Sequence, residues 1–312
     1  MIGSHAFNWL SVRGPLPYLE DREEYLLPTP RDIYIKEGKM ETMVWKATSG
    51  PGHPGTDLVA FREGPPSKEA APEWIGLKEL DKYIQGEMLE NWENPEIFLP
   101  EYKIGVALEE DRRAKEDQLF AVEHARFKEN VSLKAEIRGW EKATEEEKNL
   151  LARMDGALLG GDGRTCSVDW EAEEFNITPP QASRNLVKWV LLSPAVYTEG
   201  TIPNFVCPNS LEIQMQHGVR GPGRKIQNAR RISGRLQGWV TGKPEVISLF
   251  DGVECRAKAV YEAVPAGTVY LFETEEPEAL IRALHNRCLS AVLGEKGLGW
   301  GICATLRKEE RK

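Results

Sequence analysis

The sequence predicts an α+β fold with two ferredoxin-like βαββαβ domains in tandem, and three observations support this prediction. The chain has 312 residues, of which 41% are hydrophobic, and this is enough for two cores because one domain usually takes ~100–200 residues. Segments with the period-2 pattern of half-buried strands are interleaved with short amphipathic helices. Each half of the chain ends in the order strand, helix, strand, as a βαββαβ unit does.

The boundary between the two domains is expected at Thr178-Pro179-Pro180, because paired prolines interrupt both helices and strand ladders. The first domain then spans residues 1–178 and carries inserted loops and a helix. The second spans residues 182–312 and contains a basic insertion at 213–244 and a glycine-rich loop at 294–301. RRM-type RNA-binding domains share this architecture.

In the first half, strand-like composition and alternation predict strands at residues 7–12, 25–27, 104–108, 118–126, 131–139 and 165–170. A helix is expected at 74–86, where Leu77, Leu80 and Ile84 recur at helical spacing between charged residues. Thr144 followed by Glu147 forms a capping box, which predicts a helix from residue 145 to about residue 154.

The second half opens with the apolar run at 186–196 (LVKWVLLSPAV). A continuous apolar run of strand length is typical of a central strand that is covered on both faces. Two strands are expected within 255–273, separated by a break at 264–267, and a helix is expected at 276–289. The glycine-rich loop then leads into a terminal strand at 302–306.

The net charge of −9 argues against a protein that coats nucleic acid indiscriminately. The charge is segregated, however, because residues 213–244 contain no Asp or Glu. The basic residues of this segment are Arg220, Arg224, Lys225, Arg230, Arg231, Arg235 and Lys243. A local basic stripe on an acidic protein predicts a defined site for a polyanion such as RNA, and arginine offers bidentate contacts to phosphate.

The glycine-rich loop places four glycines within Gly294-Glu295-Lys296-Gly297-Leu298-Gly299-Trp300-Gly301. Backbone without Cβ atoms can approach a phosphate closely and present several N–H groups to it. A tight turn that needs positive φ explains the same residues equally well. Trp300 could stack on a base or pack under the loop, and the sequence leaves both alternatives open.

The five cysteines are scattered and form no Cys-x-x-Cys pair, which favours a reducing compartment over a disulfide framework or a zinc site. No apolar run reaches the ~20 residues of a membrane helix, and the N-terminus lacks a signal peptide. A cytoplasmic protein without a cofactor or metal is therefore expected.

Catalytic signatures are absent from the sequence: there is no Gly-x-Ser-x-Gly and no His-Glu-x-x-His. Only His217 lies beside the basic stripe, where it could serve as the general acid of an RNase. A non-catalytic RNA-binding role is favoured. The alternatives are an endoribonuclease and a structural subunit whose basic loop binds another protein.

Several stretches along the chain, in the expected order, resemble the RAMP superfamily of CRISPR proteins. They are residues 27–32 (LPTPRD), 105–108 (GVAL), 112–114 (RRA), 118–120 (QLF), 159–164 (LGGDGR), 190–194 (VLLSP), 232–234 (ISG), 238–239 (GW), 243–244 (KP), 265–270 (PAGTVY) and 297–301 (GLGWG). Within this superfamily the chain is similar to the subunit of type III-B (Cmr) effector complexes that caps the 5′ tag of the crRNA.

This resemblance implies a tandem ferredoxin-like fold and a role in holding the crRNA 5′ tag for antiviral defence. It also implies two protein partners, namely the large polymerase/cyclase-type subunit and a neighbouring backbone RAMP subunit. The RNA contacts that it implies, together with those from the basic stripe, are Arg112, Arg113, Arg220, Arg224, Lys225, Arg230, Arg231, Arg235, Trp239, Gly297, Gly299, Trp300 and Gly301. If the chain is instead a RAMP-type endoribonuclease, it would mature crRNA using His217.

One departure from the family pattern concerns the N-terminus. Members begin with a strand, an Arg-Asp-x-Arg-Pro-Phe-like element and a helix containing a Gly-Ala-x-Arg-like motif, and none of these precedes Phe7. The first ferredoxin-like domain is therefore expected to be N-terminally incomplete. A late-assigned start codon, a separately encoded piece and a natural minimal variant are the three explanations.

Overall fold

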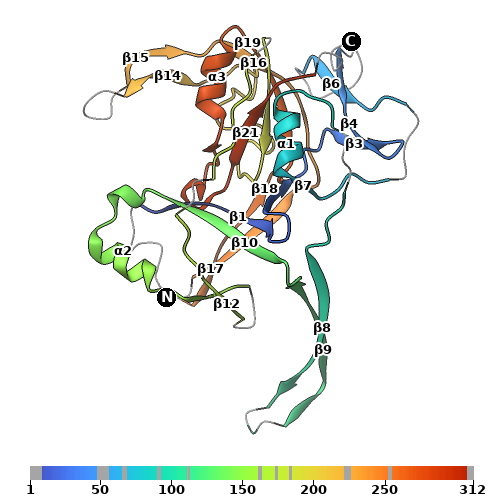
Figure 1. The fold of residues 1–312 in the computed structure, drawn as a ribbon, viewed down its shortest axis with the longest axis vertical. Helices are drawn as coiled ribbons and strands as arrows, with labels where there is room; N and C mark the ends of the chain where they lie inside the picture. Colours follow the sequence, from blue (N-terminus) through green and yellow to red (C-terminus); the bar gives the residue numbers. More distant parts are fainter. Residues whose placement is uncertain are drawn as a thin grey trace.

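The computed structural model describes residues 9–47, 56–64, 69–89, 93–109, 111, 113–160, 164–172, 175–182, 185–220, 226–251 and 255–307. These residues form a mixed α/β protein in which strands far outnumber helices (Figure 1). The α+β class expected from the sequence is confirmed.

A five-stranded antiparallel sheet organises the second half of the chain. Its strand order is β16 (Gly234–Val240), β19 (Val269–Thr274), β13 (Leu186–Leu191), β21 (Trp300–Ala304) and β20 (Arg287–Cys288). Helix α3 (Pro277–Leu284) connects β19 to β21. When β13, β16, β19 and β21 are numbered 1 to 4 along the chain, their order in the sheet is 2-3-1-4, which is the order of a ferredoxin-like unit.

The first helix of that unit has no counterpart among the described residues between β13 and β16. That segment instead forms irregular chain and a hairpin of β14 (Gln216–Arg220) and β15 (Ile226–Arg231). The basic stripe, which the sequence predicts as a loop, is therefore largely strand. Its residues 221–225 lie outside the described residues.

The first half contains a four-stranded antiparallel sheet in the order β10 (Val131–Arg138), β1 (Ser11–Leu19), β2 (Glu24–Pro28) and β7 (Trp74–Gly76). This order differs from that of a ferredoxin-like unit, so the tandem arrangement and its boundaries stay a prediction. Around the sheet lie α1 (Leu77–Ile84), α2 (Glu145–Ala152), the short helix η1 (Trp140–Lys142) and three hairpins. The hairpins are β3 (Ile33–Lys36) with β4 (Lys39–Thr42), β5 (Val44–Ala47) with β6 (Leu58–Phe61), and β11 (Gly156–Leu158) with β12 (Thr165–Ser167).

Local chemistry explains where several elements differ from their predicted bounds. β1 does not stop before Gly14-Pro15, because a bulge between Arg13 and Leu16 lets its pairing with β10 continue. Helix α3 ends at Leu284 rather than near Leu289, since Asn286 turns the chain with a positive φ of 59°. Helix α2 begins as predicted, because Thr144 and Glu147 form the complete capping box.

Strand β13 is buried along its whole length, as predicted, and separates two hydrophobic clusters. Val187, Trp189 and Leu191 face a cluster that includes α3. Leu186 and Val190 face the other cluster, to which the first half contributes Leu27, Ile35, Trp45, Ile75, Leu80 and Ile84. The two halves of the chain therefore share one core.

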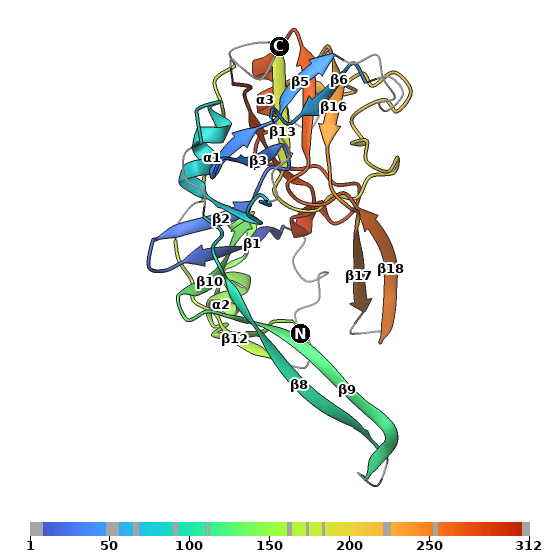
Figure 2. The same cartoon turned by 90° about the vertical axis from the view of Figure 1, so that its right-hand side faces the viewer.

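Two hairpins extend away from this shared core (Figure 2). The longer arm consists of β8 (Phe98–Leu108) and β9 (Ala114–Phe127), and the shorter one of β17 (Glu245–Asp251) and β18 (Arg256–Ala263). Every helix of the described chain is far shorter than the ~20 apolar residues needed to cross a membrane.

Candidate nucleic-acid interface

The β14–β15 hairpin carries much of the basic stripe away from the five-stranded sheet (Figure 1). Arg220 pairs with Ile226 across the hairpin, and His217 pairs with Arg230. Arg224 and Lys225 lie outside the described residues. The hairpin thus brings two segments of the basic stripe side by side.

Two arginines at the base of the hairpin have acidic partners from outside the acid-free segment. Arg231 lies 3.7 Å from a carboxylate oxygen of Glu212, and both side chains are about 60% exposed. Such an exposed pair contributes little free energy of folding, so a phosphate can replace the Glu212 carboxylate at small cost. Arg235 is held more firmly, by an ion pair with Asp57 at 2.8 Å and a hydrogen bond to the Ser210 carbonyl at 3.1 Å.

Trp239 lies on edge strand β16, where it pairs with Tyr270 of β19. Its side chain is half-buried against the cluster that includes α3. Part of the indole is therefore accessible, and the contact with RNA predicted for it stays a prediction.

The glycine-rich loop, by contrast, has already used its backbone donors. The N–H groups of Lys296 and Leu298 donate to the Leu293 carbonyl, that of Gly297 to Gly294, that of Gly299 to Pro194, and that of Trp300 to the Ser193 hydroxyl. These five donors cannot bind a phosphate without breaking bonds within the protein. Of the two alternatives for this loop, the geometry favours the tight turn over the phosphate cradle.

Positive φ and close packing explain the glycines of this turn. Gly297 has φ of 93°, and a Cβ atom there would lie 2.9 Å from the Val12 carbonyl oxygen of β1. Gly299 has φ of 70° and no room for a Cβ beside Ser290. A Cβ on Gly301 would approach the Trp189 indole to 2.4 Å. The loop is thus a docking element between the two halves.

Trp300 lies beneath the loop and is 1% exposed. Its indole N–H donates to Asn286 Oδ1 at 2.8 Å, and the Arg13 guanidinium lies 5.6 Å from its ring centre. Stacking on a base would require the ring to leave the core. The RNA contact predicted for Trp300 therefore has no support in this conformation, and the same holds for Gly297, Gly299 and Gly301.

Arg113 lies at the opposite extreme of exposure, at the tip of the β8–β9 arm. Its side chain is 85% exposed and pairs with Asp111 at 3.1 Å. Arg112 lies outside the described residues. Because this pair is exposed and contributes little free energy of folding, another anion can displace Asp111 from the Arg113 guanidinium.

Comparison with known proteins now gives these observations a context. A family model described as "CRISPR-associated protein (Cas_Cmr3)" matches residues 3–307. The chain belongs to this Cmr3 family. A solved structure described as "Cryo-EM structure of the Type III-B Cmr-beta bound to cognate target RNA" contains a chain that is 16% identical, with a TM-score of 0.41. The match covers 84% of the present chain and 65% of that chain, which is less than two thirds of its length. No curated protein matches.

Membership of the Cmr3 family confirms the resemblance to type III-B CRISPR effector subunits that the sequence motifs indicate. Several of those motifs meet where the two halves join. Arg31 of the 27–32 motif donates two hydrogen bonds to the 265–270 motif. Its backbone N–H donates to the Gly267 carbonyl at 2.8 Å, and its Nε donates to the Ala266 carbonyl at 3.1 Å. The same motif supplies Asp32, which forms a buried ion pair with Lys188 of β13.

Arg13 is the residue at this junction that motif reasoning missed. It is 4% exposed, pairs with Glu136 at 3.2 Å and donates to the Asn286 carbonyl in the other half. Burial, and then the charge of Arg138, lower the pKa of Arg13 below its usual value. A buried arginine must find partners, but the sequence does not reveal which ones, because they come from distant elements.

No group of three or more His, Cys, Asp or Glu side chains converges within the part of the chain that the structure describes. His217, the residue proposed for an endoribonuclease, lies on β14 opposite Arg230. Its backbone position beside the stripe agrees with the sequence, and its catalytic role stays a prediction.

Proposed function

We propose that this chain is a non-catalytic crRNA-binding subunit of a type III-B (Cmr) interference complex. It would hold the 5′ tag of the guide RNA and pair with the large polymerase/cyclase-type subunit, beside a backbone RAMP subunit. The observation that carries this proposal is the match to the Cmr3 family over residues 3–307.

Two features of the described residues support RNA binding. The acid-free hairpin β14–β15 extends from the edge of the sheet, and the ion pair of Arg231 at its base, with Glu212 at 3.7 Å, is exposed. Arg113 is 85% exposed at the tip of the longest arm. Since phosphate contacts from arginine provide most of the sequence-independent affinity for nucleic acid, these positions are the strongest candidates for the guide-RNA backbone.

Salt dependence of binding to a tag-containing crRNA tests the basic stripe. If four of its cations meet phosphates of single-stranded RNA, the log–log slope of the binding constant against salt is about −3, at roughly −0.7 per contact. Arg231→Ala should flatten the slope by about 0.7. The matched control is Lys46→Ala, because Lys46 also forms a partly exposed pair with a glutamate, at 3.6 Å. A wild-type slope near zero would refute the stripe as an RNA site.

The endoribonuclease alternative predicts a different result. Purified protein incubated with repeat RNA would cut it without added metal, and His217→Ala would abolish the cleavage. The non-catalytic proposal requires intact RNA in both reactions. Copurification with the polymerase/cyclase-type subunit tests the pairing with that partner.

A further inference from the structure

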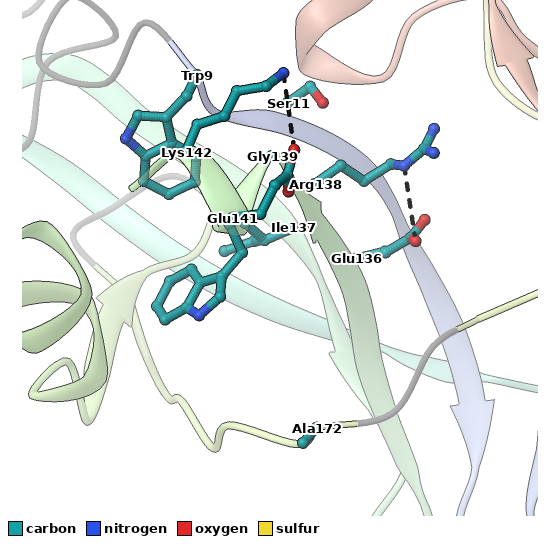
Figure 3. A pocket seen from close by; sticks show the side chains of 10 residues that line it. Trp9, Ser11, Glu136, Ile137, Arg138, Gly139, Glu141, Lys142 and Ala172 are labelled. Carbon is teal, nitrogen blue, oxygen red and sulfur yellow. Dashed lines mark ion pairs between the residues drawn. The ribbon is translucent and has the colours of Figure 1, made fainter. Parts of the chain in front are cut away.

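A polar pocket of about 540 Å³ lies at the end of β10, on the side of the first half where β1 begins (Figure 3). Its lining includes Trp9, Arg138, Trp140, Glu141 and Lys142. None of these residues belongs to the basic stripe or to the glycine-rich loop. The pocket therefore lies apart from the RNA-binding residues predicted from the sequence.

Two tryptophans, Trp9 and Trp140, line this pocket, and a third, Trp170, packs beside Trp140. Trp140 lies between the other two, with ring centres 6.0 Å from Trp9 and 6.2 Å from Trp170. Trp140 is 36% exposed and Trp170 is 42% exposed, and they are the exposed tryptophans among the described residues. Large aromatic faces left open to water at one place are typical of a surface that binds a ligand.

The surrounding backbone holds these rings in place. Gly139 has φ of 90°, and a Cβ atom there would lie 2.3 Å from the Trp9 carbonyl oxygen, so only glycine permits this approach. The indole N–H of Trp170 donates to the Met154 carbonyl at 3.1 Å. The N–H of Lys142 donates to the Gly139 carbonyl at 2.8 Å, which closes the turn that presents Trp140. The ring of Trp140 is thus positioned before any ligand arrives.

Two cations stand beside the rings and are only loosely paired. Arg138 Nε lies 3.9 Å from Glu136, and Lys142 Nζ lies 3.8 Å from Glu141, distances beyond a hydrogen bond. Glu136 is closer to Arg13, at 3.2 Å. The side chains of Arg138 and Lys142 are 45% and 69% exposed, so both can turn toward an anion.

We propose that this pocket binds one unpaired nucleotide of single-stranded RNA. The base stacks on the exposed face of Trp140, and the adjoining phosphate meets Arg138 and Lys142. Every base has a π face, so an indole accepts any of them, and cations nearby favour the sugar-phosphate backbone. A lysine or arginine side chain from a protein partner would also suit an indole. The two carboxylates that line the pocket, Glu136 and Glu141, already have cations of this chain beside them, Arg13 at 3.2 Å and Lys142 at 3.8 Å. This inference rests on the proposed function, since it assumes that the chain binds RNA.

Equilibrium binding of the full-length chain to a fluorescent eight-nucleotide single-stranded RNA tests the site. Trp140→Ala should weaken binding about 5- to 150-fold, the range expected for the loss of one base–aromatic stack. Trp140→Phe keeps an aromatic face and should stay within about threefold of the wild type. Lys142→Ala should flatten the log–log salt slope by about 0.7, because one phosphate contact is lost.

The control is Phe61→Ala, since Phe61 is 42% exposed on β6, an element that does not line the pocket. Thermal melting of each variant shows whether it folds. If Trp140→Ala does not fold, the salt slope of Lys142→Ala still tests the site. The site is overturned if Trp140→Ala keeps the wild-type affinity and Lys142→Ala keeps the wild-type salt slope. If Arg231→Ala still weakens binding in that case, the proposed function stays intact. Absence of any RNA binding by the wild type overturns both.

Discussion

At the scale of the residue, the glycine-rich loop shows that one amino-acid composition is compatible with two different structures. Its glycines are typical of both a phosphate cradle and a tight turn. The structure places Gly297 against the Val12 carbonyl of β1 and satisfies the N–H groups from Lys296 to Trp300 within the protein. The absence of a side chain at Gly297 therefore serves packing between the two halves.

Gly297→Ala should destabilise the protein. The substitution forces a Cβ into a positive φ of 93° and to 2.9 Å from the Val12 oxygen, and the backbone strain alone costs about 1–2 kcal/mol. Chemical denaturation measures the change in the free energy of unfolding. Gly294→Ala is the matched control, because its φ is not positive and its Cβ would lie 3.6 Å from the Cys288 carbonyl oxygen. Equal effects of the two substitutions would contradict the docking role.

His285 is a second residue whose role depends on its surroundings. Its Nε2 donates to the Ile177 carbonyl at 2.8 Å, while Nδ1 accepts from the Cys303 N–H at 3.1 Å. Burial, and to a smaller extent the charge of Arg13, lower the pKa of His285. The ring is therefore neutral in the folded protein, with its proton on Nε2.

The stability of the protein should consequently depend on pH through His285. The unfolded state binds a proton at His285 more readily than the folded state does. The stabilisation from neutral His285 is therefore complete above the unfolded pKa of about 6.5, and it is lost as the pH falls toward the lowered pKa of the folded state. Melting temperatures between pH 7.5 and 5 should fall less steeply for His285→Gln than for the wild type. If the melting temperatures of the wild type and of His285→Gln fall equally with pH, His285 does not cause the pH dependence of stability.

At the scale of the element, the β8–β9 arm is an amphipathic ribbon without a covering layer. Tyr102, Ile104 and Val106 share one face of β8 by alternation and are 70%, 76% and 40% exposed. Leu119, opposite Val106, is 72% exposed. An isolated two-stranded ribbon gains little free energy of folding from itself. The arm therefore contributes little to the hydrophobic core.

Shortening the arm tests this assignment. Tyr102 and Glu123 face each other across the ribbon, so residues 103–122 can be replaced by an Asn-Gly turn that closes the hairpin. The melting temperature should change by no more than about 2 °C, because no core residue is removed. Binding to crRNA or to the partner subunits should weaken. A large fall in the melting temperature would show that the arm supports the fold.

At the scale of the whole molecule, the two halves are coupled by a buried ion pair. Lys188 Nζ lies 2.9 Å from Asp32 Oδ2, and the two side chains are 1% and 0% exposed. The Tyr83 hydroxyl donates to Asp32 Oδ1 at 2.9 Å, and the Lys188 ammonium lies 4.8 Å from the Tyr83 ring centre. Together with the shared hydrophobic core, this pair makes the halves parts of one folding unit.

Lys188→Met should lower the free energy of unfolding by about 3–5 kcal/mol, because it leaves the Asp32 carboxylate buried without its cation. Adding Asp32→Asn should recover more than half of this loss, since the double variant carries no buried charge. Denaturant titrations of the single and double variants provide the measurement. A loss below about 1 kcal/mol in the single variant would mean that the pair does not couple the halves.

The sequence by itself determined the α+β class, the buried central strand, the capping box of α2, the acid-free basic segment and the family. The structural features depend on residues close together in the chain, through composition, periodicity and capping, and the family depends on the order of short motifs along the chain. Only the tertiary structure decided that the glycine-rich loop docks on β1, that Trp300 is buried and that Lys188 pairs with Asp32. It also brought Trp9 and Trp170 into contact with Trp140. These outcomes depend on hydrogen bonds and contacts between distant segments, whose partners are set by the order of strands in the sheets and not by local pattern.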